Sequence, residues 1–293
     1  MQAFYQLHPV TAAVYFAAVL GFSMFLRNPL LAVFSLTGAA AFCSFLTDAA
    51  EKRSDLRFHL PFICFVTLVN PLFSHNGRTP LFFLNGNAVT VEAICYGVYL
   101  GVMLSGVLLW CKALSKVIDA DKLLYLLGKL SPSVALVMSA VMRYLPALRR
   151  EAEALRQTQA AMGLFCSESL TDRLAGSLKI YGAMLIRLPE LAAAGGQTMR
   201  ARGFGEAKRR YYTIFRFRRR DAAVLLLTLL GMAAVICFAA TAQYTYTFYP
   251  SMTGLSFGAA QIPAYACFFG LTLLPFFAEL EEAIRWRRYR SGI

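Results

Sequence analysis

Val224 to Ala240 reads VLLLTLLGMAAVICFAA, an apolar stretch without a single charged residue. A helix needs about 20 residues to cross the ~30 Å hydrocarbon core of a bilayer at ~1.5 Å per residue, and this stretch reaches that length with a modest extension at its ends. The composition agrees, since 58% of the 293 residues are hydrophobic, 14% are aromatic and only 15% are charged. The chain therefore has the composition of an integral membrane protein and not of a soluble globule.

Five further stretches have the same character, which predicts an all-α integral membrane protein with about six transmembrane helices. Only Phe25 to Pro29 separates the first two runs, and Asn28-Pro29 is a turn signal that predicts a tight helical hairpin. The third run is short, and Pro61 and Pro71 leave its ends undecided. The six runs are Val10 to Met24, Leu30 to Leu46, Leu60 to Phe73, Val91 to Trp110, Val224 to Ala240 and Pro263 to Ala278.

A strongly basic segment, residues 112–220, separates the fourth run from the fifth. It holds 20 of the 29 Lys and Arg residues and 8 of the 16 acidic residues, so its net charge of +12 is nearly the whole +13 of the chain. We therefore expect three regions. These are N-terminal transmembrane helices at 1–111, a basic cytoplasmic region with long helices at 112–220, and C-terminal transmembrane helices with a basic tail at 221–293.

The other loop charges predict how the chain is oriented, because Lys and Arg near the ends of membrane helices stay on the cytoplasmic side. Residues 51–57 carry three basic residues and the C-terminal tail carries four, whereas loops 75–90 and 241–258 share a single one, Arg78. A multi-pass protein with six crossings and both termini in the cytoplasm satisfies every loop. In the last outer loop, the aromatic residues Tyr244, Tyr246, Phe248 and Tyr249 are expected to form an interfacial belt.

Apolar residues in the basic segment recur with a helical period, so this segment is expected to form several helices. Two of its stretches, Val134 to Met142 and Leu174 to Leu188, are apolar enough to be partly embedded. The first is too short to span a bilayer and the second contains Lys179 and Arg187, so we expect both to be buried beneath the membrane helices. Eight crossings are the alternative.

A pattern occurs twice within the basic segment. Arg143-Tyr144-Leu145-Pro146-Ala147-Leu148 leads to a helix ending in Ala161-Met162-Gly163-Leu164, and Arg187-Leu188-Pro189-Glu190-Leu191 leads to one ending in Ala201-Arg202-Gly203-Phe204. Each proline suits the first turn of a helix, where its missing N–H costs nothing, and each glycine suits a C-terminal cap with positive φ. Two similar helices predict two similar partners.

Arg202 stands at the end of the second helix, between the small residues Ala201 and Gly203. Its guanidinium can project beyond the last turn and bind carboxylate or carbonyl groups of another subunit, while its small neighbours let a foreign backbone approach closely. The alternative is that Arg200 and Arg202 only add to the positive charge on the cytoplasmic side.

Residues able to do chemistry are sparse. The seven cysteines are scattered singly, the three histidines are isolated, and the apolar runs contain no acidic cluster, so the sequence predicts no metal site, no catalytic residue and no bound cofactor. It contains no Walker-type phosphate loop and no nucleic-acid-binding motif, so neither ATP hydrolysis nor nucleic-acid binding is expected of this chain.

Four stretches together resemble the transmembrane T component of energy-coupling factor (ECF) transporters, the family that includes the cobalt-transport permeases of the CbiQ type. They are Asn28-Pro29-Leu30, Asn70-Pro71-Leu72-Phe73, the stretch Asp121 to Pro146 ending in Met142-Arg143-Tyr144-Leu145-Pro146, and Ala201-Arg202-Gly203-Phe204. ECF transporters are ABC-type importers of vitamins and metal ions. The resemblance covers nearly the whole chain and implies a non-catalytic subunit in the cell membrane.

The resemblance also implies a role for the two helix ends. In the family, two cytoplasmic coupling helices, each ending in Ala-Arg-Gly, dock on two ABC-type ATPase subunits, while the membrane helices hold a small membrane-embedded substrate-binding S component. Ala201-Arg202-Gly203-Phe204 is therefore expected to dock on an ATPase. The first motif departs from the pattern and reads Ala161-Met162-Gly163. This departure predicts a mainly hydrophobic contact through Met162, whose unbranched thioether adapts to irregular grooves.

Two other functions remain open. A self-contained polytopic membrane enzyme or secondary transporter would place paired carboxylates, metal ligands or charged residues among its membrane helices. An ordinary ABC permease would share the ATPase docking but form its own pore, and copurification of a small S component would distinguish the two. The transported substrate stays open, because in the T-component family the S component recognises it.

Overall fold

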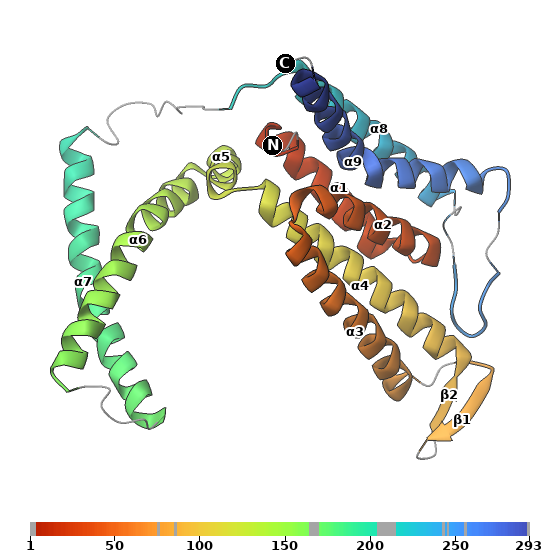
Figure 1. The fold of residues 1–293 in the computed structure, drawn as a ribbon, viewed down its shortest axis with the longest axis horizontal. Helices are drawn as coiled ribbons and strands as arrows, with labels where there is room; N and C mark the ends of the chain where they lie inside the picture. The colour runs from red at the N-terminus through yellow and green to blue at the C-terminus, as the bar shows by residue number, and fades with distance from the viewer. Residues whose placement is uncertain are drawn as a thin grey trace. The chain divides into compact units, whose positions relative to one another are not determined.

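The computed structural model describes residues 4–74, 77–84, 87–163, 170–203, 215–241, 244, 246–254 and 257–291. Helices dominate these residues, with one β-hairpin among them, so the predicted all-α class is confirmed (Figure 1). The elements are α1 Pro9–Phe25, α2 Pro29–Leu46, α3 Ala49–Phe73, β1 Pro80–Leu84, β2 Asn87–Thr90, α4 Val91–Val117, α5 Ala120–Leu130, α6 Pro132–Ala161, α7 Leu170–Ala201, α8 Arg219–Ala240 and α9 Gln261–Ser291.

The elements form two compact units. Unit 1 is Met1–Leu123 together with Phe215–Ile293 and contains α1 to α4, the hairpin, α8 and α9. Unit 2 is Leu124–Ile214 and contains most of α5 together with α6 and α7. The chain thus leaves unit 1 within α5 and returns to it shortly before α8.

Each of the six predicted apolar runs lies within a helix of unit 1. Five helices in the described part of the chain, α2, α3, α4, α8 and α9, are long and apolar enough to cross a membrane, and α1 is shorter, with 17 residues. At ~1.5 Å per residue α1 still extends for about 25 Å, close to the ~30 Å of the hydrocarbon core. Six crossings therefore remain the prediction, and neither α6 nor α7 is among the candidate spans found in the described residues.

The predicted turn at Asn28-Pro29 is confirmed between α1 and α2. The side chain of Asn28 accepts the N–H of Leu30 at 3.0 Å and caps α2, whose first residue is Pro29. Asn28 is only 1% exposed, and its amide donates to the carbonyl of Tyr244 at 3.3 Å and to the hydroxyl of Tyr265 at 3.1 Å. This turn is therefore attached both to α9 and to the segment that precedes it.

Aromatic rings fill the core between α1, α2 and α4. Trp110 of α4 stacks on Phe42 of α2 with ring centroids 6.2 Å apart, and Tyr15 and Phe16 of α1 meet Trp110 edge-on. The indole N–H of Trp110 donates to the Ser35 hydroxyl at 3.1 Å, so the one polar atom of this fully buried ring has a partner. Ring contacts of this geometry fix how the three helices pack.

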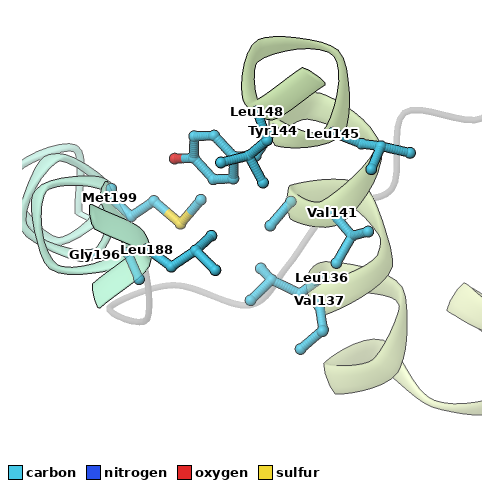
Figure 2. A pocket seen from close by; sticks show the side chains of 12 residues that line it. Leu136, Val137, Val141, Tyr144, Leu145, Leu148, Leu188, Gly196 and Met199 are labelled. Carbon is cyan, nitrogen blue, oxygen red and sulfur yellow. The ribbon is translucent and has the colours of Figure 1, made fainter. Parts of the chain in front are cut away.

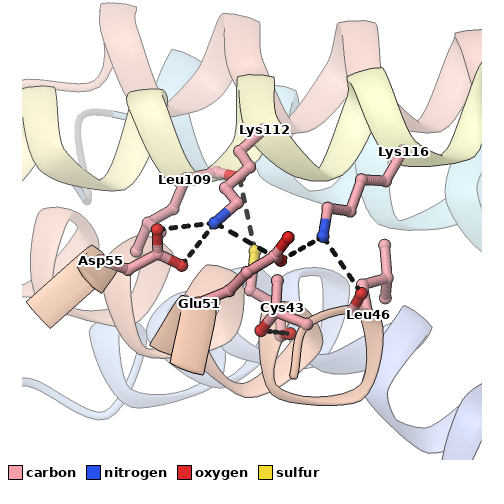
Figure 3. Close-up of polar contacts among 8 residues, drawn as sticks. Cys43, Leu46, Glu51, Asp55, Leu109, Lys112 and Lys116 are labelled. Carbon is pink, nitrogen blue, oxygen red and sulfur yellow. Dashed lines mark hydrogen bonds and ion pairs between the residues drawn. The ribbon is translucent and has the colours of Figure 1, made fainter. Parts of the chain in front are cut away.

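Ion pairs join α3 to α4 (Figure 3). Lys112 Nζ contacts the two carboxylate oxygens of Asp55 at 2.6 and 2.7 Å and lies 4.0 Å from Glu51, which also pairs with Lys116. The prediction that residues 51–57 form a loop is wrong, because α3 already begins at Ala49. An acidic residue is favourable in the first turn of a helix, and the lysines of α4 neutralise this one.

A short β-hairpin connects α3 to α4, and the apolar runs did not predict it. β1 and β2 pair antiparallel, with Phe83 opposite Ala88. Glu92 in the first turn of α4 accepts a hydrogen bond from the Thr79 hydroxyl at 2.7 Å and another from the Arg78 N–H at 3.3 Å. The base of the hairpin is thereby fixed to the start of α4.

Two of the four aromatic residues between α8 and α9, Tyr244 and Phe248, pack inward, which contradicts an interfacial position for these two, whereas Tyr246 and Tyr249 are half-buried and their place at the interface stays a prediction. Tyr244 is 4% exposed and donates its hydroxyl to the Ala264 carbonyl at 2.7 Å. Phe248 is 7% exposed and lies against Tyr96 and Tyr99 of α4, with centroid distances of 5.2 and 5.0 Å. Because the protein itself satisfies the polar tip and buries the rings, these side chains do not need the membrane interface.

In unit 2, α6 and α7 are continuous helices of 30 and 32 residues. Pro146 and Pro189 lie inside them, so the prediction that each proline begins a helix is wrong. An interior proline costs about 3 kcal/mol, whereas nucleating a new helix, with a constant near ~10⁻³, costs about 4 kcal/mol, so continuing the helix is the cheaper course. No residue of α6 is buried within unit 2 itself, and the burial of Val134 to Met142 beneath the membrane helices stays a prediction.

Candidate docking site

α6 ends at the first predicted docking motif. Ala161 is its last residue, Met162 is the C-cap, and Gly163 follows with φ +85°. The Met162 N–H donates to the Thr158 carbonyl and the Gly163 N–H donates to the Ala160 carbonyl, both at 3.1 Å. Glycine adopts this left-handed conformation without the penalty that a Cβ would add, so the predicted glycine cap is confirmed here.

α7 ends in the same way at the second motif. Ala201 is its last residue, and Gly203 has φ +75°. The Arg202 N–H donates to the Thr198 carbonyl at 3.2 Å, and the Gly203 N–H donates to the Arg200 carbonyl at 2.9 Å. The second predicted glycine cap is therefore also confirmed, and Arg202 occupies the position that Met162 occupies in α6.

The two ends also share a sequence signal that the sequence analysis missed. The pattern Gln-Thr-x-x-Ala-x-Gly occupies residues 157–163 and again 197–203, shifted by 40 positions. In both copies the threonine hydroxyl donates to a carbonyl of the preceding turn, from Thr158 to Ala154 at 2.9 Å and from Thr198 to Gly195 at 2.8 Å. The prolines do not share this 40-residue shift, since Pro146 lies 17 residues before Gly163 and Pro189 lies 14 residues before Gly203.

The predicted docking residues lie on the surface. Ala161, Met162, Gly163, Ala201 and Arg202 are exposed, with 70% for Met162, and Gly203 is half-buried. The Arg202 guanidinium makes no hydrogen bond or ion pair with any residue that the structure describes. Phe204, the last residue of the second motif, lies outside the described residues.

The structure separates the two ends along the helix pair. α6 and α7 contact each other and run antiparallel, so their C-terminal ends point to opposite ends of the pair (Figure 1). A helix as long as α7 extends for about 48 Å at ~1.5 Å per residue. The two exposed ends can therefore meet two separate partners.

An apolar cavity of 370 Å³ lies between α6 and α7 (Figure 2). Leu188 and Met199 of α7 point across it toward α6. The helices approach closely at Gly195, where an added Cβ would lie 2.6 Å from the hydroxyl oxygen of Tyr144. The lining residues are Leu136, Val137, Ala140, Val141, Tyr144, Leu145, Leu148, Leu188, Ala192, Gly195, Gly196 and Met199.

Apolar residues that do not line this cavity are also exposed on α7. Leu178, Leu185 and Ile186, which are 70%, 65% and 73% exposed, add apolar surface on α7. Among the described residues no group of three or more His, Cys, Asp or Glu side chains is placed to hold a metal ion. What unit 2 presents is therefore two exposed helix ends, one with Arg202 and one with the apolar Met162, and apolar surface on its helices.

Comparison with known protein families matches residues 2–213 to the family described as cobalt transport protein, CbiQ. The chain belongs to the CbiQ family. The match covers more than two thirds of the 293 residues and runs from α1 past the end of α7, so both helix ends fall within it. As a CbiQ-family member with five long apolar helices among its described residues, the chain is a multi-pass membrane component of a transport system.

Proposed function

We propose that this CbiQ-family chain is the T component of an ECF-type ABC importer. In this role it carries motion from two ATPase subunits to a small membrane-embedded S component, which binds the substrate, a vitamin or a metal ion. The chain itself catalyses no reaction. It lies in the plasma membrane with both termini in the cytoplasm, an orientation supported by the basic residues of 51–57, 112–220 and the C-terminal tail.

The equivalence of the two helix ends carries this proposal. Both ends place an exposed side chain at the C-cap, both follow it with a glycine at positive φ, and both bind the cap N–H to a threonine carbonyl four residues earlier. A chain that docks on two similar ATPase subunits needs such a duplicated surface. The antiparallel arrangement of α6 and α7 supplies one end for each subunit (Figure 1).

The two docking contacts differ in chemistry. Arg202 brings a planar guanidinium that can form two parallel hydrogen bonds with a carboxylate, whereas Met162 brings a flexible apolar side chain. We expect the end of α7 to contribute more to ATPase binding, and the end of α6 to fill an apolar groove. The two ends would then respond to the two subunits unequally.

The apolar face of unit 2 fits a hydrophobic partner. Its cavity of 370 Å³ and the exposed leucines of α7 lie on helices whose ends face the ATPases. An S component is itself membrane-embedded and can cover apolar surface of this kind. Long helices that contact both partners are able to transmit motion between them.

The test is a mild-detergent pull-down of the tagged chain from its own host, with mass spectrometry of the bound proteins. Arg202→Glu should lose most of the ATPase while the chain remains in the membrane, because it places a carboxylate where a cation is needed. The matched control is Arg200→Glu, which makes the same charge change at an exposed position in the last turn of the same helix.

The outcomes separate the candidate functions. Two ATPases and a small membrane protein with the wild type, lost only with Arg202→Glu, support the importer and name its substrate class through the S component. If Arg202→Glu and Arg200→Glu lose equal amounts of bound ATPase, Arg202 contributes only positive charge. If Met162→Ala and Arg202→Ala lose equal amounts of bound ATPase, the unequal docking of the two helix ends is refuted. Recovery of the chain alone would favour a self-contained membrane enzyme or secondary transporter.

A further inference from the structure

The chain passes between the two units twice, and one short segment of unit 1 holds both passages. The first passage runs through the corner between α4 and α5, residues 117–123, and the second comes just before α8, at residues 215–219. The segment that binds them is residues 4–8, which precedes α1. All contacts between this segment and the two passages lie within unit 1.

Tyr5 binds the first passage through Lys122. The Lys122 ammonium donates to the carbonyl of Tyr5 and, at 2.9 Å, to the carbonyl of Val117, and it lies 4.4 Å from the centroid of the Tyr5 ring. The Tyr5 hydroxyl donates to Asp119. Lys122 is only 4% exposed, and burial lowers its pKa from the ordinary lysine value while Asp119 opposes that shift. A lysine so deeply buried holds these carbonyls firmly, because its charge has no water to replace them.

His8 binds the second passage through Asp221. The backbone N–H of His8 donates to Asp221 Oδ1 at 2.9 Å, and Asp221 Oδ2 accepts the N–H of Arg218 at 2.7 Å. The His8 ring also meets the ring of Phe217 edge-on, with centroids 5.3 Å apart. Asp221 is 3% exposed, so its carboxylate is another buried charge held by main-chain N–H groups.

Phe4 anchors the segment to the core. Its ring is fully buried and meets Tyr15 and Phe42 edge-on at centroid distances of 5.2 and 5.5 Å. Its N–H donates to Glu279 Oε1 of α9 at 2.8 Å. The segment is therefore attached to the membrane helices as well as to both passages.

From these contacts we infer that residues 4–8 act as a clamp that holds both passages at fixed points on the membrane helices. Tyr5 and His8 are three residues apart, so even a fully extended chain keeps their anchor points within about 11 Å. A displacement of unit 2 would then move the membrane helices, because the two passages could not shift along these helices. Lys122 and Asp221 are positioning residues in this device, which rests on the coupling role proposed above.

The clamp can be tested on the full-length chain by pulsed electron–electron spin resonance. Spin labels go on Ser44→Cys in α2 and Ala193→Cys in α7, both exposed positions, in a background without the seven native cysteines. Lys122→Met and Asp221→Asn should each broaden the distribution of label distances, and the double variant should broaden it most. The matched control is Lys112→Met, which removes another lysine of unit 1 that binds α3 and neither passage.

Two further measurements guard the result. Lys122→Arg, which can still donate to both carbonyls, should restore the narrow distribution of label distances. If Lys122→Met does not fold, Tyr5→Phe takes its place, and the loss of the hydroxyl alone should broaden the distribution slightly. The thermal unfolding midpoint is recorded for each variant. A lower midpoint without broadening, or equal broadening with Lys112→Met, would overturn the clamp and leave these residues a purely structural role.

The same labels separate failure of the clamp from failure of the coupling role. In the purified complex with its ATPases, a non-hydrolysable ATP analogue should shift the distances of the wild type, and the shift should be lost in the Lys122→Met, Asp221→Asn double variant although the ATPases stay bound. If no ATPase copurifies, the coupling role fails, and the distances of the chain alone still decide whether the clamp exists.

Discussion

Gly203→Ala should disrupt the end of α7 by an amount set by one backbone angle. Gly203 has φ +75°, and an L-residue with a Cβ costs about 1 to 2 kcal/mol in this left-handed region. A cost of this size shifts the balance between closed and open helix end by a factor of about 5 to 30. Gly163→Ala should cost the same at the end of α6, where φ is +85°.

Gly182→Ala is the matched control within α7. Gly182 lies in the helix interior, and an added Cβ would meet nothing within 4 Å. Alanine there should stabilise the helix by about 0.5 to 1 kcal/mol, because it lowers the conformational entropy of the unfolded chain. The same substitution is thus expected to have opposite signs at two positions of one helix.

Amide hydrogen exchange measures this effect where it occurs. The amide of Gly203, bonded to the Arg200 carbonyl at 2.9 Å, and that of Arg202 should exchange faster in Gly203→Ala by the factor given above. The pull-down then gives the functional consequence, a larger loss of ATPase with Gly203→Ala than with Gly163→Ala. Unchanged exchange in Gly203→Ala would refute the assigned role of the glycine, and equal ATPase losses would refute the unequal docking.

Two further predictions concern unit 1. Asn28→Ala should lower the free energy of unfolding by about 2 to 4 kcal/mol, because it removes the cap of α2 (~1 kcal/mol) and leaves the buried Tyr244 carbonyl without its donor (~1 to 3 kcal/mol). The control Thr37→Ala, at an exposed position of α2, should change the free energy of unfolding little. Thermal unfolding in detergent measures both variants. Lys112→Asp should lower the unfolding midpoint, and adding Asp55→Lys should recover most of the loss by restoring the pair in reverse, so a double variant no better than the single one would contradict their pairing.

The membrane helices were predictable because one physical demand dominates their sequence. A segment in hydrocarbon must be apolar over about 20 residues, so each of the six runs could be located without knowledge of its neighbours. The start of α3 was less predictable. α3 begins at Ala49, before its apolar run, because Glu51 and Asp55 find lysine partners on α4, which the sequence of α3 does not show.

Glycine and proline in unit 2 show the same contrast. Gly163 and Gly203 were assigned correctly as helix ends, because a positive φ is a local demand that the neighbouring residues also signal. Pro146 and Pro189 were assigned wrongly, because a proline only weakens a helix, and whether the helix continues depends on the cost of starting another.

The tripeptide Asn-Pro-Leu shows how far one motif can be interpreted without a structure. At Asn28 the asparagine caps α2, while at Asn70 it lies within α3 and donates its amide to the Ala93 carbonyl of α4 at 2.6 Å. Both asparagines satisfy a main-chain group, but one does so in its own helix and the other in a neighbour. The letters alone do not distinguish these roles.

The buried charges of the clamp extend this argument. The sequence analysis counted Lys122 among the charges of the basic segment 112–220 and left Asp221 as the residue that follows it, and solvent exposure is the ordinary state of both residue types. In the structure both are buried, and their partners are main-chain carbonyl and N–H groups of Tyr5, Val117, His8 and Arg218. Main-chain groups are the same in every residue, so a contact of this kind has no complementary side chain that could be recognised in the sequence. Residues that position two distant segments can therefore be identified only when the fold has brought the segments together.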